Sequence, residues 1–153
     1  MLSQKAKYAL KALMALAAVG EDELLQAAEI ADQHNIPKKF LDLILLELRR
    51  HKLVDSRRGK KGGYLLGKPA ETIMLGDIVR IIDGPLAPLP CASVTAYRRC
   101  ADCRDERACE VRRVMREVRD AAALILDHRS LADIVSKKPA KKSKSTRALR
   151  RVA

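Results

Sequence analysis

The sequence of 153 residues predicts a mainly α fold: a winged helix-turn-helix with a small β-hairpin wing, followed by a long amphipathic helix. Three observations predict this class. Apolar residues make up 48% of the chain and aromatic residues only 3%, which favours helices over a β-sandwich or barrel. Three helical patterns precede two strand-like runs around a glycine-rich tip. An apolar stripe at helical spacing then returns after residue 110.

The first three predicted helices follow each other closely. Leucine and alanine recur at helical spacing in residues 3–19, and a second, shorter helix is expected over residues 25–33. The turn after the second helix contains Asn35, which tolerates a left-handed backbone conformation. Pro37 suits the first position of a third helix, which is expected to extend to about residue 50.

The third predicted helix has two different faces when its residues are placed 100° apart. Five apolar side chains form one continuous face that is expected to pack inward: Phe40, Leu41, Ile44, Leu45 and Leu48. The opposite face is polar with a basic bias, and it carries Lys38, Lys39, Asp42 and Arg49, with Leu46 beside them. The pattern therefore predicts one buried and one solvent-facing side.

The predicted wing consists of two short strands, residues 53–56 and 64–66, on either side of a tip with three glycines. Four basic side chains belong to this tip: Arg57, Arg58, Lys60 and Lys61. A short helix over residues 73–82 completes a winged helix-turn-helix domain, residues 1–83.

The second half of the chain divides into three parts. Residues 84–109 contain three prolines and all four cysteines, lack clear periodicity, and are expected to form a loop, here called the cysteine segment. Residues 110–135 are expected to form a long helix and a final short turn that Ser130 caps. Six residues form the apolar stripe of the long helix: Val111, Val114, Met115, Val118, Ala122 and Ile125. Residues 136–153 are expected to be a disordered basic tail.

The net charge of +12 is concentrated in two places. The tail holds eight basic residues and no acidic one, and without it the net charge is +4. Residues 49–61 alone carry +6, so the rest of the chain is slightly acidic. A basic stretch on an acidic body indicates a polyanionic partner.

A helix-turn-helix followed by a basic hairpin predicts binding to double-stranded DNA. The major groove admits one helix, so the third helix is expected to enter it. Lys38 and Lys39 would reach phosphates or guanine edges, and Asp42 would accept a hydrogen bond from a cytosine amino group. The wing tip would lie over the adjacent backbone or minor groove. The alternative, a solvated basic turn, suits an isolated hairpin better than one that follows a helix-turn-helix.

Five motifs carry a family resemblance: Lys7-Tyr8-Ala9-Leu10, Ile36-Pro37-Lys38-Lys39-Phe40-Leu41, Leu53-Val54-Asp55-Ser56-Arg57-Arg58-Gly59, Gly62-Gly63-Tyr64-Leu65-Leu66 and Asp83-Gly84-Pro85-Leu86-Ala87. Together they resemble the Rrf2 family of bacterial transcription regulators, which includes the IscR, NsrR and RirA regulators. The resemblance covers about residues 1–135. It implies a homodimer with a winged helix at each end, in which the helix over residues 110–127 pairs the subunits. Without the resemblance, the apolar stripe would fit a core helix equally well.

The four cysteines lie within 19 residues: Cys91, Cys100, Cys103 and Cys109, separated by eight, two and five residues. Four thiolates match the ligand number of an iron–sulfur cluster or of an all-cysteine zinc site. An irregular, proline-containing loop can wrap around a metal where a regular helix cannot. The spacing therefore predicts a metal site in the cysteine segment.

The resemblance implies an iron–sulfur cluster, with two or four irons, that senses iron, redox state or nitric oxide. Sensor members of the family bind their cluster through three cysteines of this segment and a variable fourth ligand. The gap of five residues between Cys103 and Cys109 matches their pattern, whereas the gap after Cys91 is longer and Cys100 is additional. Some members supply an acidic fourth ligand near the amino terminus. Residues 5–8 contain no acid here, so Cys100 or Cys103 would complete an all-cysteine site.

Other interpretations of the cysteines stay open at this point. Zinc is the second candidate metal, the thiols would also suit a metal-free redox switch, and a metal-free repressor would answer to another ligand. Four arginines surround the thiols: Arg98, Arg99, Arg104 and Arg107. They would lower the thiol pKa values and offset the charge of a cluster, or they are only surface charges. The Cys100–Cys103 motif also occurs in thiol oxidoreductases, but no βαβ pattern accompanies it, so no enzyme is predicted. His34, His51 and His128 are expected to be structural or exposed.

The sequence contains no secretory signal and no run of about 18 apolar residues. A cytoplasmic protein without membrane contact is therefore expected. In that reducing compartment, four cysteines favour metal or redox chemistry over structural disulfides.

Overall fold

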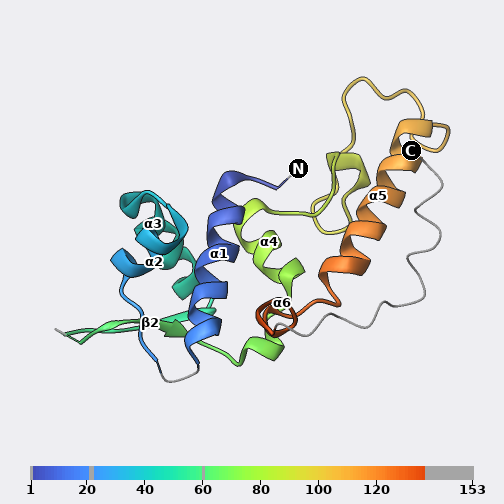
Figure 1. Cartoon of the computed structure of the whole chain (residues 1–153). Coiled ribbons are helices and arrows are strands. Elements are labelled where there is room, and N and C mark those ends of the chain that lie inside the picture. The colour runs from blue at the N-terminus through green and yellow to red at the C-terminus, as the bar shows by residue number, and fades with distance from the viewer. Residues whose placement is uncertain (1, 21–22, 60, 137–153) are drawn as a thin grey trace.

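The structure, a computed structural model, describes residues 2–20, 23–59 and 61–136. Its elements follow in the order α1 (Gln4–Val19), α2 (Ala27–His34), α3 (Lys38–Arg50), β1 (Val54–Arg57), β2 (Gly63–Leu66), η1 (Ala70–Thr72), α4 (Leu75–Asp83), η2 (Pro90–Ala92), α5 (Glu110–Leu126) and α6 (Leu131–Val135). The predicted mainly α winged fold is confirmed. Figure 1 shows a body of α1 to α4 with the hairpin at one end and α5 at its side.

The central helix of the body is α1. Ser3 caps it, because the Ser3 hydroxyl accepts a hydrogen bond from the Ala6 amide at 3.0 Å. Ala6, Ala9 and Ala12 are fully buried, and their small side chains let other elements approach the helix closely. Helix α1 accordingly contacts α3, α4, α6 and β2, and it forms the centre of the core.

The helix-turn-helix forms where the sequence predicts it. Helix α2 begins with a capping box in which the Gln26 amide donates to the Glu29 carboxylate at 2.7 Å. The helix ends at Asn35 with φ 52° and ψ 52°, the predicted left-handed conformation. Pro37 is the residue before α3 rather than its first residue, and its φ of −56° directs the chain into the helix.

The inward face of α3 is confirmed. Leu41, Ile44, Leu45 and Leu48 are buried in the core that α1 and α4 share. Phe40 is half-buried, and its ring lies edge-on to the ring of Tyr8 with the two centroids 5.8 Å apart. This packing fixes the side of α3 that faces solvent.

The wing is a two-stranded antiparallel hairpin. Val54 pairs with Leu66 and Arg57 pairs with Gly63. The segment before α2 extends the pairing, because Leu25 and Tyr64 exchange backbone hydrogen bonds of 2.8 and 3.0 Å. The base of the wing is therefore joined to the helix-turn-helix.

Gly63 lies at a point where only a glycine fits. A Cβ atom at this position would lie 2.7 Å from the carbonyl oxygen of Leu25. We expect Gly63→Ala to lower the free energy of unfolding by about 1–3 kcal/mol, because the wing must move away from residue 25 to relieve the contact. Urea denaturation measures this change. Arg58→Ala in the exposed tip is the control and should leave the stability unchanged; equal stabilities for both variants would contradict the close approach.

After α5 the chain returns to the body. The Leu131 amide donates to Ile73 O at 2.8 Å and the Leu75 amide donates to Arg129 O at 2.9 Å, so the segment before α6 pairs with the segment before α4. Ser130 caps α6 as predicted, through a capping box with Asp133. Leu131 is fully buried and belongs to the main core. The predicted basic tail lies outside the described residues from 137 onward.

No helix of the described residues is both long enough and apolar enough to cross a bilayer.

Candidate nucleic-acid interface and cysteine segment

The solvent-facing side of α3 carries the predicted polar residues. Lys38, Lys39 and Arg49 are exposed, and Asp42 is partly exposed beside them. The Lys38 ammonium forms an ion pair with the Asp42 carboxylate, with Nζ 3.1 Å from Oδ2. This i, i+4 pair neutralises one charge of each sign at the start of the helix.

The wing is held in a fixed position relative to α3. Arg49 Nη1 donates a hydrogen bond to the Ser56 hydroxyl at 3.0 Å and so joins the end of the helix to β1. Beyond the last strand pair, the Gly62 amide donates to Gly59 O at 2.9 Å, and Gly59 has a φ of 118°, which only glycine adopts readily. Arg57, Arg58 and Lys61 are exposed, while Lys60 lies outside the described residues.

Two residues of this face escaped the sequence analysis. Leu43 is 62% exposed and Arg50 is exposed on the same side of α3 as Lys39. Their positions on the helical wheel could have predicted this, because both residues lie opposite the buried face of α3. Leu46, which the sequence placed beside the polar residues, is 38% exposed.

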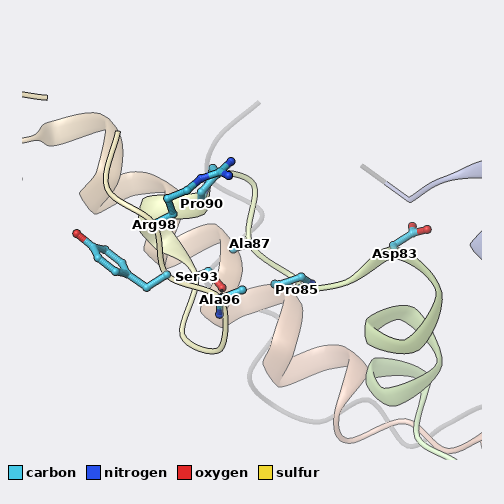
Figure 2. Close-up of a pocket in the computed structure, with 8 residues that line it drawn as sticks. Asp83, Pro85, Ala87, Pro90, Ser93, Ala96 and Arg98 are labelled. Atoms are coloured by element: carbon cyan, nitrogen blue, oxygen red, sulfur yellow. Dashed lines mark hydrogen bonds between the residues drawn. The ribbon is translucent and has the colours of Figure 1, made fainter. Parts of the chain in front are cut away.

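The cysteine segment begins with a closed turn. The Arg98 amide donates to Pro90 O at 3.2 Å, and the Ala96 amide donates to the Ser93 hydroxyl at 3.0 Å. Figure 2 shows this turn and the residues that line the pocket beside it, from Arg98 to Asp83 at the end of α4. The volume of this pocket is about 550 Å³. Cys91 is buried in η2, and the thiol of Cys100 interacts with it.

Neighbouring thiols of the segment act on one another. Hydrogen bonding with the Cys91 thiol, followed by burial, raises the pKa of Cys100. Burial, followed by the charge of Cys109 and a hydrogen bond with it, raises the pKa of Cys103. The charge of Arg99 opposes the rise at Cys103, but its effect is the smallest of the causes. The prediction that the surrounding arginines lower the thiol pKa values is therefore wrong for these two residues.

Arg112 of α5 holds the two ends of the cysteine segment together. Its Nε donates to Cys91 O at 2.9 Å, and its backbone amide donates to the Cys109 sulfur at 3.4 Å. Its guanidinium also lies over the Tyr97 ring, 5.9 Å from the centroid. About two turns further along α5, Arg119 Nη1 donates to Ala92 O at 2.5 Å. Two arginines thus fasten η2 to α5.

Arg112→Ala is expected to expose the buried thiol of Cys91. A hydrogen bond from a charged donor contributes about 1.5–3 kcal/mol, so its loss should make the turn open about tenfold more often. The rate of Cys91 alkylation in reduced, metal-free protein, followed by mass spectrometry, measures the opening. Arg116→Ala, an exposed arginine of the same helix, is the control, and Arg112→Lys should restore part of the protection. Equal alkylation rates in wild type and Arg112→Ala would contradict the assignment.

The donor set for a metal is present but divided. All four cysteines lie in described residues and are free thiols. No group of three or more histidine, cysteine or carboxylate side chains gathers around one point among residues 2–20, 23–59 and 61–136. The thiols therefore fit an iron–sulfur cluster or zinc by chemistry and number.

The apolar stripe of α5 is not used within the subunit. No residue of α5, all of which is described, is buried. Val111, Val114, Val118 and Ile125 of the stripe are between 43% and 60% exposed. Arg112 and Arg119 lie on another side of the helix and contact η2. A monomer thus leaves an apolar surface about 25 Å long in water.

An ion pair joins the far end of α5 to α4. Arg80 donates to both carboxylate oxygens of Asp127, at 2.7 and 2.8 Å. Gly76 lies directly against this carboxylate, and a Cβ atom there would collide with it. The hydrogen bond from Arg80, followed by its charge, lowers the pKa of Asp127.

The lowered pKa predicts an acid-sensitive part of the stability. The folded state favours the Asp127 carboxylate, so this contribution is complete above the unfolded pKa of about 3.9 and disappears as the pH falls through the lower folded value. We expect Asp127→Asn to flatten the dependence of unfolding free energy on pH below about 4, measured by urea titrations. Asp32→Asn, at an exposed position of α2, should keep the wild-type slope. An unchanged slope in Asp127→Asn would contradict the ion pair.

A family comparison explains these features together. The model of the Rrf2 family, described as iron-dependent transcriptional regulator, matches residues 2–137. The chain belongs to the Rrf2 family. It is therefore a transcriptional regulator and not an enzyme.

Relatives of known sequence support this membership. An rrf2-like HTH-type transcriptional regulator of Rhodobacter capsulatus is 45% identical over 139 residues, which cover 89% of this chain and 93% of the relative. An HTH-type transcriptional regulator of Mycobacterium tuberculosis is 42% identical over 86 residues, which cover 56% of this chain and 53% of that protein.

Solved structures share the fold of this Rrf2 protein. CymR (YrzC), the global cysteine regulator of B. subtilis, is 30% identical with a TM-score of 0.75, over 91% of this chain and 98% of that one. The oxidised form of Staphylococcus aureus CymR is 26% identical with a TM-score of 0.72, over 91% and 98%. T. potens IscR, at 24% identity and a TM-score of 0.70 over 88% and 85%, shares the fold.

Proposed function

We propose that this Rrf2 regulator is a homodimeric repressor that binds a specific site on double-stranded DNA and releases it when its cysteine segment changes state. The place of action is the cytoplasm, where bacterial chromosomes lie. In this proposal α3 of each subunit enters the major groove and each wing contacts the neighbouring phosphates. The exposed basic residues of α3 and the wing support this arrangement. The domain limits proposed from the sequence, 1–83, 84–109, 110–135 and 136–153, correspond to these roles.

One observation carries the link between sensing and DNA binding. The turn that contains Cys91 is fastened to α5 by Arg112 and Arg119, and α5 is the helix with the uncovered apolar stripe. If two copies of this stripe pair, a change in the cysteine segment acts directly on the dimer helix. The distance between the two copies of α3 then changes, and half-sites on DNA are a fixed distance apart.

An iron–sulfur cluster of two or four irons is the group we propose for the cysteine segment. Cys91, Cys100, Cys103 and Cys109 would hold it, and such a cluster supplies coordination that is sensitive to iron supply, oxidants and nitric oxide. The four free thiols and the family description support this choice. Zinc is the second candidate, because four thiolates also suit a structural zinc ion.

A thiol switch without metal is the alternative function, and the pairing of the thiols favours it. Among the thiols, Cys91 acts most strongly on the pKa of Cys100, and Cys109 is the thiol that raises the pKa of Cys103. In each pair, two thiols would give two electrons and two protons to a peroxide, and one S–S bond would form. Hydrogen peroxide would become two water molecules, and an organic peroxide would become an alcohol and water.

Anaerobic purification tests these alternatives. Visible absorption together with bound iron and sulfide is expected, and DNA footprinting with and without the bound iron should show different affinities. Cys109→Ser should abolish the absorption and the difference in affinity; Thr95→Ala, at an exposed position of the same segment, keeps all four thiols and is the control. Iron-free protein with bound zinc, or iron-free protein whose thiols pair after peroxide, would replace the cluster by the respective alternative. Iron-free protein whose DNA affinity is the same after loss of all four cysteines would refute the sensing role.

A further inference from the structure

Two leucines are exposed in the middle of the polar face of α3. Leu43 is 62% exposed and Leu46 is 38% exposed. With 100° per residue they lie about 60° apart around the helix, with Lys39 between them. They therefore form a narrow apolar strip on the side of α3 that faces away from the core.

The fold does not need this strip. Leu41, Ile44, Leu45 and Leu48 are each fully buried and complete the inward face of the helix. The solvent-facing side of such a helix ordinarily carries polar side chains. An exposed leucine at these positions is thus available for a partner.

The surrounding charge indicates which partner fits. Lys39 and Arg50 flank the strip on α3. Arg57 and Arg58 of the wing are also exposed, and the wing is joined to α3 by the hydrogen bond from Arg49 to Ser56. Lys38 and Asp42 neutralise each other, and Glu47, one turn after Leu43, is paired with Lys5, so the net charge around the leucines is positive. A cationic border suits the phosphates of a nucleic acid. In the major groove, the apolar group that a side chain meets at a base edge is the 5-methyl group of thymine.

We infer that Leu43 and Leu46 determine specificity by contacting thymine methyl groups in the major groove, while the basic residues around them contact phosphates. The inference rests on the proposed function, because α3 must enter the groove. It assigns the central contacts of the helix to apolar readout instead of hydrogen bonds. The preferred site is then one with thymines at the positions that face the middle of α3.

Replacing thymine by uracil tests the inference, because uracil keeps the base pair and lacks only the methyl group. The full-length protein is first used to select its preferred duplex from random sequence. Each thymine of that duplex is then replaced in turn by uracil, and the dissociation constants are measured by fluorescence anisotropy at fixed salt. A buried methyl contributes about 0.8 kcal/mol, so affinity should fall about fourfold at each contacted thymine.

The leucine variants complete the test. Leu43→Ala should bind the thymine and uracil forms equally at one position, and Leu46→Ala should do so at another. Leu124→Ala, an equally exposed leucine of α5, is the control and should keep the fourfold ratio. Thermal unfolding of the variants is expected to match wild type, because neither leucine is buried.

The outcomes separate this inference from the proposed function. If wild type binds no duplex in preference to random DNA, the proposed function fails. If it binds a preferred duplex and its affinity is the same for the thymine and uracil forms at every position, only the reading of methyl groups is overturned. A ratio that survives in both leucine variants also overturns it. If these variants dissociate the oligomer while the ratio persists, the strip is an interface between copies of the chain.

Discussion

A double substitution of Val114→Glu and Val118→Glu is expected to separate the proposed dimer into folded monomers. Both valines belong to the apolar stripe of α5 and are 43% and 47% exposed in the subunit. Placing four carboxylates in a paired apolar interface is costly, whereas in the monomer they face water. A monomer binds one half-site without the other, so affinity for the full site should fall by about two orders of magnitude or more.

Light scattering after size exclusion measures the mass, and anisotropy with a two-half-site duplex measures the affinity. Arg116→Glu is the matched control, since it changes charge on an exposed part of the same helix. Circular dichroism should show that both variants keep the helices, because no residue of α5, which is described throughout, is buried. A double variant that stays dimeric would show that another surface joins the subunits.

The second large effect is expected from the wing. Arg57→Ala with Arg58→Ala removes two exposed cations per subunit, and four from the proposed dimer. Each lost phosphate contact lowers the slope of log affinity against log salt by about 0.9. The slope should therefore decrease by up to about four, with a loss of about two to three orders of magnitude in affinity near 0.15 M salt.

This loss should be similar for preferred and random duplexes, because phosphate contacts carry no base information. Arg104→Ala with Arg107→Ala is the control: it removes the same charge from exposed positions of the cysteine segment, away from the wing. Equal salt slopes for the two double variants would mean that the wing contributes only through net charge.

The fold could be predicted from the sequence wherever a local rule acts alone. Asn35 adopts the left-handed conformation because its short polar side chain tolerates it, and Ser130 caps α6 because its hydroxyl reaches the amide of Asp133. The inward face of α3 followed from periodicity, since the buried side chains repeat at helical spacing.

The site was predicted less completely, because its contacts join residues far apart in sequence. The bond from Arg112 to Cys91 spans 21 residues and that from Arg119 to Ala92 spans 27, and periodicity carries no information on such contacts. The expectation for the thiol pKa values failed for a related reason. Proximity in sequence suggested that arginines act on the thiols, whereas burial and the partner thiols determine the direction. Leu43 was not predicted as a site residue because the DNA-binding candidates were chosen by charge, and Leu43 is an apolar residue on the polar face of α3.

The pairing of the segments before α4 and α6 has a consequence for how such regulators diversify. The Leu131 amide donates a hydrogen bond to Ile73 O, and Arg80 forms an ion pair with Asp127. Residues 84–126 therefore leave the body and return to it at neighbouring points. The DNA-reading body is structurally closed without them. Evolution can therefore lengthen, shorten or exchange the intervening segment, together with its cysteines, as a cassette, while the body that recognises DNA keeps its own core. The additional Cys100 and the long gap after Cys91 are changes of the kind that this architecture tolerates.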